Sequence, residues 1–119
     1  MNGPSLRVLI VDDHPVVRAG LTALIDADPS MDVVGSAATV AETEALDADS
    51  RPDVCVVDLR LPDGDGIALG ASLKSRWPTT RVLVLTMTSD PAAVIRSLGA
   101  GLDGYLLKDS DPAELLAAV

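Results

Sequence analysis

The chain has 119 residues, which is enough for one domain with a sizeable core and too few for two independent domains. Its formal net charge of −9 argues against binding of nucleic acid or an anionic membrane by this segment, because both partners require clustered Lys and Arg. The single cysteine excludes an intramolecular disulfide, and the first residues and the apolar runs lack the patterns of a signal peptide or a membrane span, so we expect a cytoplasmic protein.

Five short apolar segments predict strands, and their lack of polar alternation is typical of a parallel sheet that is covered by helices on both faces. They span residues 6–11, 31–37, 54–57, 82–85 and 105–107. Helical patterns fill the intervals, beginning with residues 15–26, where Pro15 suits the first position of a helix. Capping-box spacing predicts further helix starts near residues 40 and 112, and Ser89-Asp90-Pro91 is typical of another.

This alternation predicts an α/β fold, a flavodoxin-like (βα)5 domain whose five-stranded parallel sheet has the order 2-1-3-4-5 with helices on both faces. We expect residues 1–119 to form this single domain. The last predicted helix is still running at Val119 without a Gly or Asn stop, which indicates that this helix is truncated and that the chain was taken from a longer protein.

Polar residues follow the predicted strands at the edge of the sheet where ligands bind in such folds. Asp12 and Asp13 follow the first strand, Asp58 the third, Thr86 the fourth and Lys108 the fifth. Because the first and third strands are neighbours in the predicted order, we expect Asp13 and Asp58 to converge. The sequence therefore predicts a polar site that is assembled from residues far apart in the chain.

The charges of this predicted site indicate which ligand it takes. Two carboxylates about 5 Å apart repel by roughly 3 kcal/mol at an effective dielectric constant near 20, so three of them need compensating positive charge. Lys108 offsets one charge, and the remaining deficit of two matches Mg²⁺ (or Mn²⁺) better than calcium, which prefers more protein ligands. Asp58 ends its strand alone and is the predicted nucleophile for a phosphoryl group, whereas the Asp12-Asp13 pair is arranged to hold the metal.

Four segments together resemble the receiver domains of two-component response regulators, and the resemblance covers nearly the whole chain. They are Val11-Asp12-Asp13-His14, Val57-Asp58-Leu59-Arg60-Leu61-Pro62 with Gly66, Leu85-Thr86, and Gly104-Tyr105-Leu106-Leu107-Lys108. The segments around His14 and Lys108 are most similar to the NarL/FixJ branch, whose members usually carry a LuxR-type helix-turn-helix domain after the receiver domain.

The resemblance implies a phosphoacceptor and a magnesium site. Asp58 would accept a phosphoryl group from a sensor histidine kinase, and such a domain catalyses only its own phosphoryl transfer and dephosphorylation rather than the turnover of a separate substrate. The implied metal ligands are the side chains of Asp13 and Asp58 and the backbone carbonyl of Arg60, with Asp12 helping through its side chain or a water molecule.

The resemblance also implies a switch. Lys108 would pair with the phosphoryl oxygens, Thr86 would move toward the phosphate, and Tyr105 would change its exposure in step. These changes would alter the activity of an attached output domain and favour a phosphorylation-dependent homodimer. Contact with DNA would come only through that output domain, which this chain does not contain.

Structural interpretations of single residues stay open beside the functional ones. Asp12 and Asp13 could simply cap the helix that starts at Pro15. We expect His14 to be a loop or first-turn residue rather than a metal ligand, and Trp77 to be a packing residue at a helix end.

Two motif-like strings are predicted to be turns. Residues 99–104 fit the pattern G-x-G-x-x-G, but they lead from a helix into a strand, which is the reverse of the dinucleotide-binding arrangement. The string Asp63-Gly64-Asp65-Gly66 is similar to a calcium loop, but carboxylates are missing where such a loop needs them, at Leu61 and Ser72.

Two other functions compete with the phosphorylation switch. A Mg²⁺-dependent phosphatase with an aspartyl nucleophile needs a second carboxylate just after that nucleophile, where this chain has Leu59-Arg60-Leu61. A phosphate-independent interaction module on the same fold would bind its partner equally well without Asp58.

Overall fold

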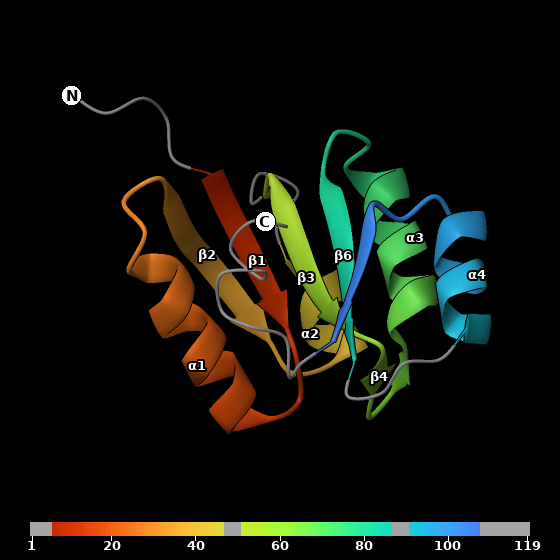
Figure 1. Ribbon diagram of the computed structural model, residues 1–119, viewed down its shortest axis with the longest axis horizontal. Helices are drawn as coiled ribbons and strands as arrows, with labels where there is room; N and C mark the ends of the chain where they lie inside the picture. Colours follow the sequence, from red (N-terminus) through yellow and green to blue (C-terminus); the bar gives the residue numbers. More distant parts are fainter. Residues whose placement is uncertain (1–5, 47–50, 87–90, 108–119) are drawn as a thin grey trace.

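The computed structural model describes residues 6–46, 51–86 and 91–107, and it shows a parallel sheet with helices on both faces (Figure 1). The strands of this sheet are β1 (Leu6–Val11), β2 (Met31–Ala37), β3 (Val54–Asp58), β6 (Arg81–Thr86) and β7 (Gly104–Leu107). The helices are α1 (Pro15–Asp26), α2 (Val40–Glu44), α3 (Gly66–Arg76) and α4 (Pro91–Gly99). Two further strands, β4 (Arg60–Leu61) and β5 (Gly64–Asp65), pair antiparallel in a small hairpin.

The strand order of the main sheet is β2-β1-β3-β6-β7, and every neighbouring pair is parallel. Counted along the chain without the hairpin strands, this is the predicted order 2-1-3-4-5, so the predicted flavodoxin-like arrangement is confirmed. The third and fourth strands are longer than predicted, because Asp58 still pairs with Leu85 in the ladder and Thr86 pairs with Leu107.

Alternating residues of the strands build two cores, one on each face of the sheet. On one face, Leu9, Val57 and Val84 belong to a buried cluster with the α3 residues Leu69 and Leu73. The other face packs on α1, and its cluster is Val8, Ile10, Val54, Val56, Leu83 and Leu85 with Leu21, Ile25 and Met31. Because successive side chains of a strand point to opposite faces, strands buried on both faces must be apolar throughout, which explains the unbroken apolar runs.

Several local predictions are confirmed by hydrogen bonds. The Oγ1 of Thr39 accepts a hydrogen bond of 3.0 Å from the backbone N–H of Glu42, as the capping box at the start of α2 requires. Pro15 occupies the first position of α1. Trp77 is 4% exposed at the end of α3 and belongs to the core cluster on that face.

Residues 99–104 form a turn, as predicted, whereas in the string Asp63-Gly64-Asp65-Gly66 only Asp63 lies in a turn and Gly66 already begins α3. Gly99 ends α4, Gly101 has a positive φ of 79°, and Gly104 begins β7, so the glycines of residues 99–104 stop a helix and reverse the chain. Pro62 and Asp63 form the tight turn of the β4–β5 hairpin, and Gly64 and Asp65 are its second strand. This hairpin was not predicted, because strands of two residues carry no hydrophobic periodicity.

Some sequence predictions fall outside the described residues. These are the helix start near residue 112, the cap residues Ser89 and Asp90, and the position of Lys108. Within the described ranges, no helix combines the length and the apolar character that a membrane span needs.

Candidate functional site

The parallel pairing of β1 with β3 brings the acidic residues of the two strand ends together. Val11 pairs with Val57 in this ladder. Asp12 and Asp58 are the next residues after this pair, so the two aspartates are neighbours at the ends of the adjacent strands. The backbone N–H of Asp12 donates to the carbonyl of Ala37 at 3.0 Å, which extends the β1–β2 pairing by one residue. Asp12 is fully buried and Asp58 is 4% exposed, so both carboxylates are held inside the carboxyl edge of the sheet.

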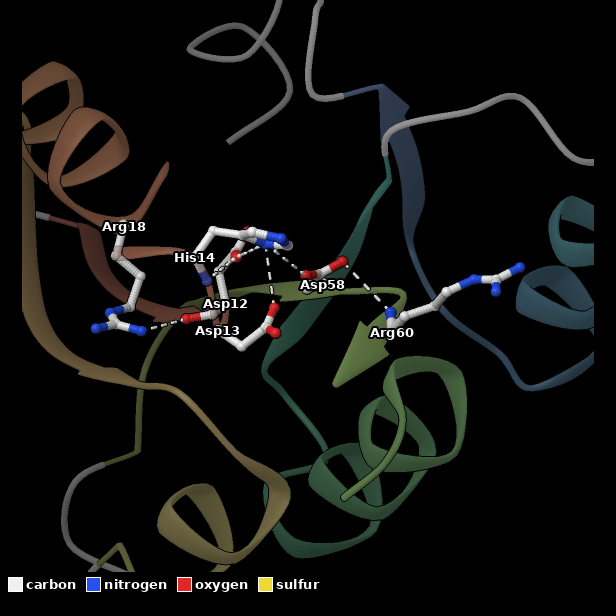
Figure 2. A network of polar contacts seen from close by, with 6 residues as sticks. All are labelled: Asp12, Asp13, His14, Arg18, Asp58 and Arg60. Atoms are coloured by element: carbon white, nitrogen blue, oxygen red, sulfur yellow. Dashed lines mark hydrogen bonds and ion pairs between the residues drawn. The ribbon is translucent and has the colours of Figure 1, made fainter. Parts of the chain in front are cut away.

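Four side chains converge at this edge, as Figure 2 shows. Asp12, Asp13, His14 and Asp58 each present an oxygen or nitrogen atom, and these four atoms lie within 4.8 Å of one another. The expected convergence of Asp13 with Asp58 is therefore present in the structure. The site combines three carboxylates with one imidazole.

Hydrogen bonds orient two of these carboxylates. Asp12 Oδ1 accepts from the backbone N–H of His14 at 2.8 Å, and Asp58 Oδ1 accepts from the backbone N–H of Arg60 at 3.3 Å (Figure 2). The guanidinium of Arg18, from α1, donates to the backbone carbonyl of Asp12 at 2.6 Å. The side chain of Arg60 points away from the carboxylates, so its guanidinium does not neutralise them (Figure 2).

The donor set of the site fits a divalent cation. Asp13 Oδ1 is buried and accepts no hydrogen bond from the described residues, although His14 Nδ1 lies 3.1 Å away. A buried carboxylate oxygen without a donor is costly unless a cation binds it. Three carboxylates that offer oxygen atoms at close range are the ligands that Mg²⁺ prefers.

A close backbone contact positions the loop after Asp58. The N–H of Gly66, the first residue of α3, donates to the carbonyl of Leu59 at 2.8 Å, and the N–H of Leu59 donates to Leu85 of β6 at 2.8 Å. Asp65 caps α3 by accepting from the N–H of Ile67 at 2.9 Å. The segment that contains Arg60 is therefore held between β6 and the start of α3.

The predicted switch residues lie on the neighbouring strands. Thr86 is 5% exposed at the end of β6, one position beyond Leu85, which pairs with Asp58. Tyr105 on β7 pairs with Val84 and is half-buried against the core on the α3 face. The structure thus places Thr86 at the same edge as Asp58, whereas Lys108 falls outside the described residues.

Sequence reasoning missed two contributors to the site. His14 is the N-cap residue of α1, which agrees with its predicted first-turn position, but its ring lies against the carboxylates. Arg18 was not singled out. Its spacing of one helical turn from His14 was the available signal, since residues four apart share a face of a helix.

Fold and site together define a flavodoxin-like α/β domain with an acidic pocket at the carboxyl edge of its parallel sheet. The model of the response regulator receiver domain matches residues 8–119 of this sequence. The chain therefore belongs to the response regulator receiver domain family of two-component signalling proteins. Receiver domains generally bind Mg²⁺ at an acidic pocket, and this structure has a cluster of acidic residues at the carboxyl edge of its sheet.

Two curated relatives show the branch of the family that the chain resembles. It is 49% identical over 114 residues to the DNA-binding transcriptional activator DevR/DosR of Mycobacterium tuberculosis, covering 96% of this chain and 52% of the relative. It is 35% identical over 115 residues to the oxygen regulatory protein NreC of Staphylococcus epidermidis, covering 96% of this chain and 53% of the relative. The chain thus spans about half the length of these relatives.

Solved structures agree with this assignment. The signal receiver domain of NarL from Mycobacterium tuberculosis matches with a TM-score of 0.90 and 36% identity, covering 98% of this chain and 94% of that one. The isolated REC domain of RcsB from Salmonella enterica serovar Typhimurium, solved in the presence of the phosphomimetic BeF3−, has a TM-score of 0.86 and 29% identity, covering 95% and 84%. The predicted similarity to the NarL branch is confirmed.

Proposed function

We propose that this receiver domain accepts a phosphoryl group on Asp58 from a sensor histidine kinase, in a reaction that requires Mg²⁺ (or Mn²⁺). The observation that carries the proposal is the convergence of Asp12, Asp13 and Asp58 at one edge of the sheet, with ligand atoms within 4.8 Å. The structure of the similar RcsB domain was solved in the presence of a phosphomimetic, which supports phosphoryl chemistry for this family of domains.

Asp58 is the proposed nucleophile because it ends the central strand and its carboxylate has a defined orientation. One carboxylate oxygen accepts the hydrogen bond from the backbone of Arg60, and the residue is 4% exposed. An Asp58 oxygen attacks the phosphorus of the donor, the bond from phosphorus to the donor's leaving group breaks, and the leaving group departs with that electron pair. The product is an aspartyl phosphate.

Asp12, Asp13, Asp58 and the backbone carbonyl of Arg60 are the proposed metal ligands. Bound Mg²⁺ supplies charge neutralisation for the phosphoryl oxygens during transfer. Lys108 is the proposed second cation that pairs with the phosphoryl group. Both positive charges are needed because the carboxylates at the buried strand ends repel an incoming anion, and burial strengthens this repulsion.

Thr86 and Tyr105 are the proposed switch residues. Thr86 is buried beside Asp58 on the next strand, and Tyr105 lies one strand further on, half-buried on the α3 face. A phosphoryl group that binds the Thr86 hydroxyl in one conformation only shifts the population toward it. A coupling of about 1 to 3 kcal/mol changes partner binding by roughly 5- to 150-fold.

The receiver domain is proposed to control the output domain of a longer protein. The curated relatives are about twice as long as the matched region, and DevR/DosR is described as a DNA-binding transcriptional activator. We infer a LuxR-type DNA-binding output, DNA contact through that domain alone, and a phosphorylation-dependent homodimer. The high negative charge of this chain supports the absence of direct DNA contact. The proposed location is the cytoplasm.

The phosphorylation proposal is tested by intact mass spectrometry after incubation with a small-molecule phosphodonor, with and without Mg²⁺. We expect the wild type to gain the mass of one phosphoryl group only with Mg²⁺, and Asp58→Asn to gain none. Asp32→Asn, which removes an exposed aspartate on β2, is the matched control and should gain as the wild type does. Equal gain in the Asp58→Asn variant would rule out the assigned phosphoacceptor.

The competing hydrolase hypothesis gains no support from the residues after Asp58. Leu59 and Leu61 are 7% and 8% exposed and apolar, so neither position offers the second acid or base that such an enzyme needs. Incubation with a phosphomonoester should give no release of phosphate beyond that of a protein-free control. A pull-down of the partner with Asp58→Ala tests the phosphate-independent interaction module, which predicts unchanged binding.

A further inference from the structure

The ring of His14 lies among the carboxylates of the acidic pocket rather than against the helix it precedes. His14 Nδ1 is 3.0 Å from Asp12 Oδ1, 3.1 Å from Asp13 Oδ1 and 3.7 Å from Asp58 Oδ2 (Figure 2). Although His14 is the N-cap residue of α1, its side chain makes no capping hydrogen bond. The position of the ring is therefore explained by the carboxylates and not by helix capping.

These spacings match the corners of one coordination shell. An octahedral ion with ligand distances of about 2.1 Å holds adjacent ligand atoms about 3.0 Å apart and opposite ones about 4.2 Å apart. The distances from His14 Nδ1 to Asp12 and Asp13 equal the adjacent spacing, and the distance to Asp58 lies between the two values. All four ligand atoms lie within 4.8 Å of one another, so small shifts of the side chains would bring them around a single ion.

The chemistry of an imidazole ligand differs from that of a carboxylate. Oxygen ligands suit Mg²⁺, whereas imidazole nitrogen favours first-row transition ions, and affinity rises from Mn²⁺ through Co²⁺. We propose that His14 Nδ1 is a fourth side-chain ligand of the metal site and strengthens the binding of a transition-metal ion such as Co²⁺ relative to Mg²⁺. The inference rests on the proposed metal site and adds a specificity-determining residue to it.

The backbone keeps this ligand in place. The N–H of His14 donates to Asp12 Oδ1 at 2.8 Å, and Pro15 fixes the next residue at the start of α1. The side chain is 58% exposed, so an ion from solvent can reach the ring nitrogen. A hydrogen bond of 3.0 Å between His14 Nδ1 and Asp12 Oδ1 also orients the ring.

His14 is the only histidine of the chain, so any imidazole signal from an untagged protein comes from this residue. In the ¹H NMR spectrum of the Co²⁺-loaded chain, a ligating imidazole gives a strongly shifted, exchangeable Nε2–H resonance. We expect this resonance in water, its loss in D2O, and its absence from His14→Ala. Wild-type Co²⁺ spectra without such a resonance would overturn the assignment of His14 as a ligand.

Calorimetric titration with Mg²⁺ and Co²⁺ measures selectivity without any activity assay. His14→Ala and His14→Asn should weaken Co²⁺ binding by about 10-fold or more and change Mg²⁺ binding by less than about 3-fold. The Asn variant retains a hydrogen-bond donor, so equal losses in both variants exclude a role limited to hydrogen bonding. Full retention of Co²⁺ preference by either variant contradicts the proposal.

Asp13→Asn is the comparison variant. It should weaken the binding of both Mg²⁺ and Co²⁺, because it removes a carboxylate ligand that the two ions share. Circular dichroism confirms that each variant is folded before titration. If both ions bind the wild type without imidazole ligation, only the role of His14 fails and the phosphorylation proposal stands. If neither ion binds the wild type, the metal site fails and both proposals are overturned.

Discussion

A Cβ atom on Gly66 would lie 1.9 Å from the backbone carbonyl oxygen of Asp58. The start of α3 is therefore packed directly against the backbone of the proposed phosphoacceptor. No side chain fits between the two backbones. Glycine is required at position 66 because the helix backbone approaches the Asp58 backbone so closely. The contact ties the position of Asp58 to the helix that covers one face of the sheet.

Substitution of Gly66 by alanine should destabilise the domain by roughly 2 kcal/mol or more, because backbone atoms must move to admit the methyl group. Urea unfolding followed by circular dichroism gives the free energy. Gly20→Ala in the exposed face of α1 is the control, since its Cβ would meet nothing within 4 Å. We expect that variant to be more stable by about 0.5–1 kcal/mol. Equal stability of the two variants would disprove the contact.

Metal binding should stabilise the domain through the three carboxylates. At a free Mg²⁺ concentration 100 times its Kd, the free energy of unfolding should rise by about 2.7 kcal/mol. Asp13→Asn should raise the stability of the metal-free protein, on the order of 1 kcal/mol, because it relieves carboxylate repulsion. The same variant should lose most of the gain from Mg²⁺. Thermal unfolding with EDTA and with Mg²⁺ measures both effects, and an undiminished Mg²⁺ gain in Asp13→Asn would argue against Asp13 as a ligand.

Asp63 should make a pH-dependent contribution to stability. Its carboxylate accepts hydrogen bonds from the backbone N–H groups of Val40 at 2.7 Å and Ala41 at 3.0 Å, and these hold its pKa below the ordinary value of 3.8. A depressed pKa stabilises the folded state above the unfolded pKa and loses this effect as pH falls through the folded pKa.

The stability difference between wild type and Asp63→Asn should therefore be largest near about pH 7 and shrink as the pH falls below about 4. Urea unfolding across this range measures the difference. Asp32→Asn removes an equal charge from an exposed site and corrects for net charge. A difference between wild type and Asp63→Asn that stays constant over the whole range would contradict the proposed role of the two backbone hydrogen bonds.

Cys55 should be unreactive in the folded protein. The side chain is fully buried in β3, and burial raises the pKa of its thiol from 9.0 to about 12. This rise alone lowers the thiolate fraction near neutral pH about a thousandfold, and the thiolate is the reactive form. A colorimetric thiol reagent should label the native chain only at the rate of unfolding and label it at once in guanidinium chloride. Rapid labelling of the native protein would show that β3 is more accessible than the structure indicates.

Much of the fold could be predicted because it depends on local patterns. Five apolar runs of strand length that are separated by helical segments are compatible with few topologies. Right-handed crossovers, together with one point at which the strand order reverses, lead to the observed strand order. The capping box at Thr39 and the glycines of residues 99–104 act over three to six residues, so their roles were visible in the sequence. The hairpin of β4 and β5 was not predicted, because each of its strands has only two residues and shows no recognisable pattern.

The candidate site was predictable in outline for a similar reason. Because parallel strands end at a common edge, residues that follow β1 and β3 must approach one another once the strand order is known. The direction of the His14 ring was not predictable, since an N-cap residue can orient its side chain toward the helix or away from it. The hydrogen bond from Arg18 to the backbone of Asp12 likewise depends on a rotamer choice made after packing.

The alternation of strands and helices, the apolar character of both sheet faces and the acidic residues at the strand ends all follow from the order of amino acids. The close approach of Gly66 to the Asp58 carbonyl and the place of the His14 ring among three carboxylates follow from packing. Propensity and periodicity act between residues that are near one another in the chain. The distances in these contacts, in contrast, are set only when the sheet and its helices have packed.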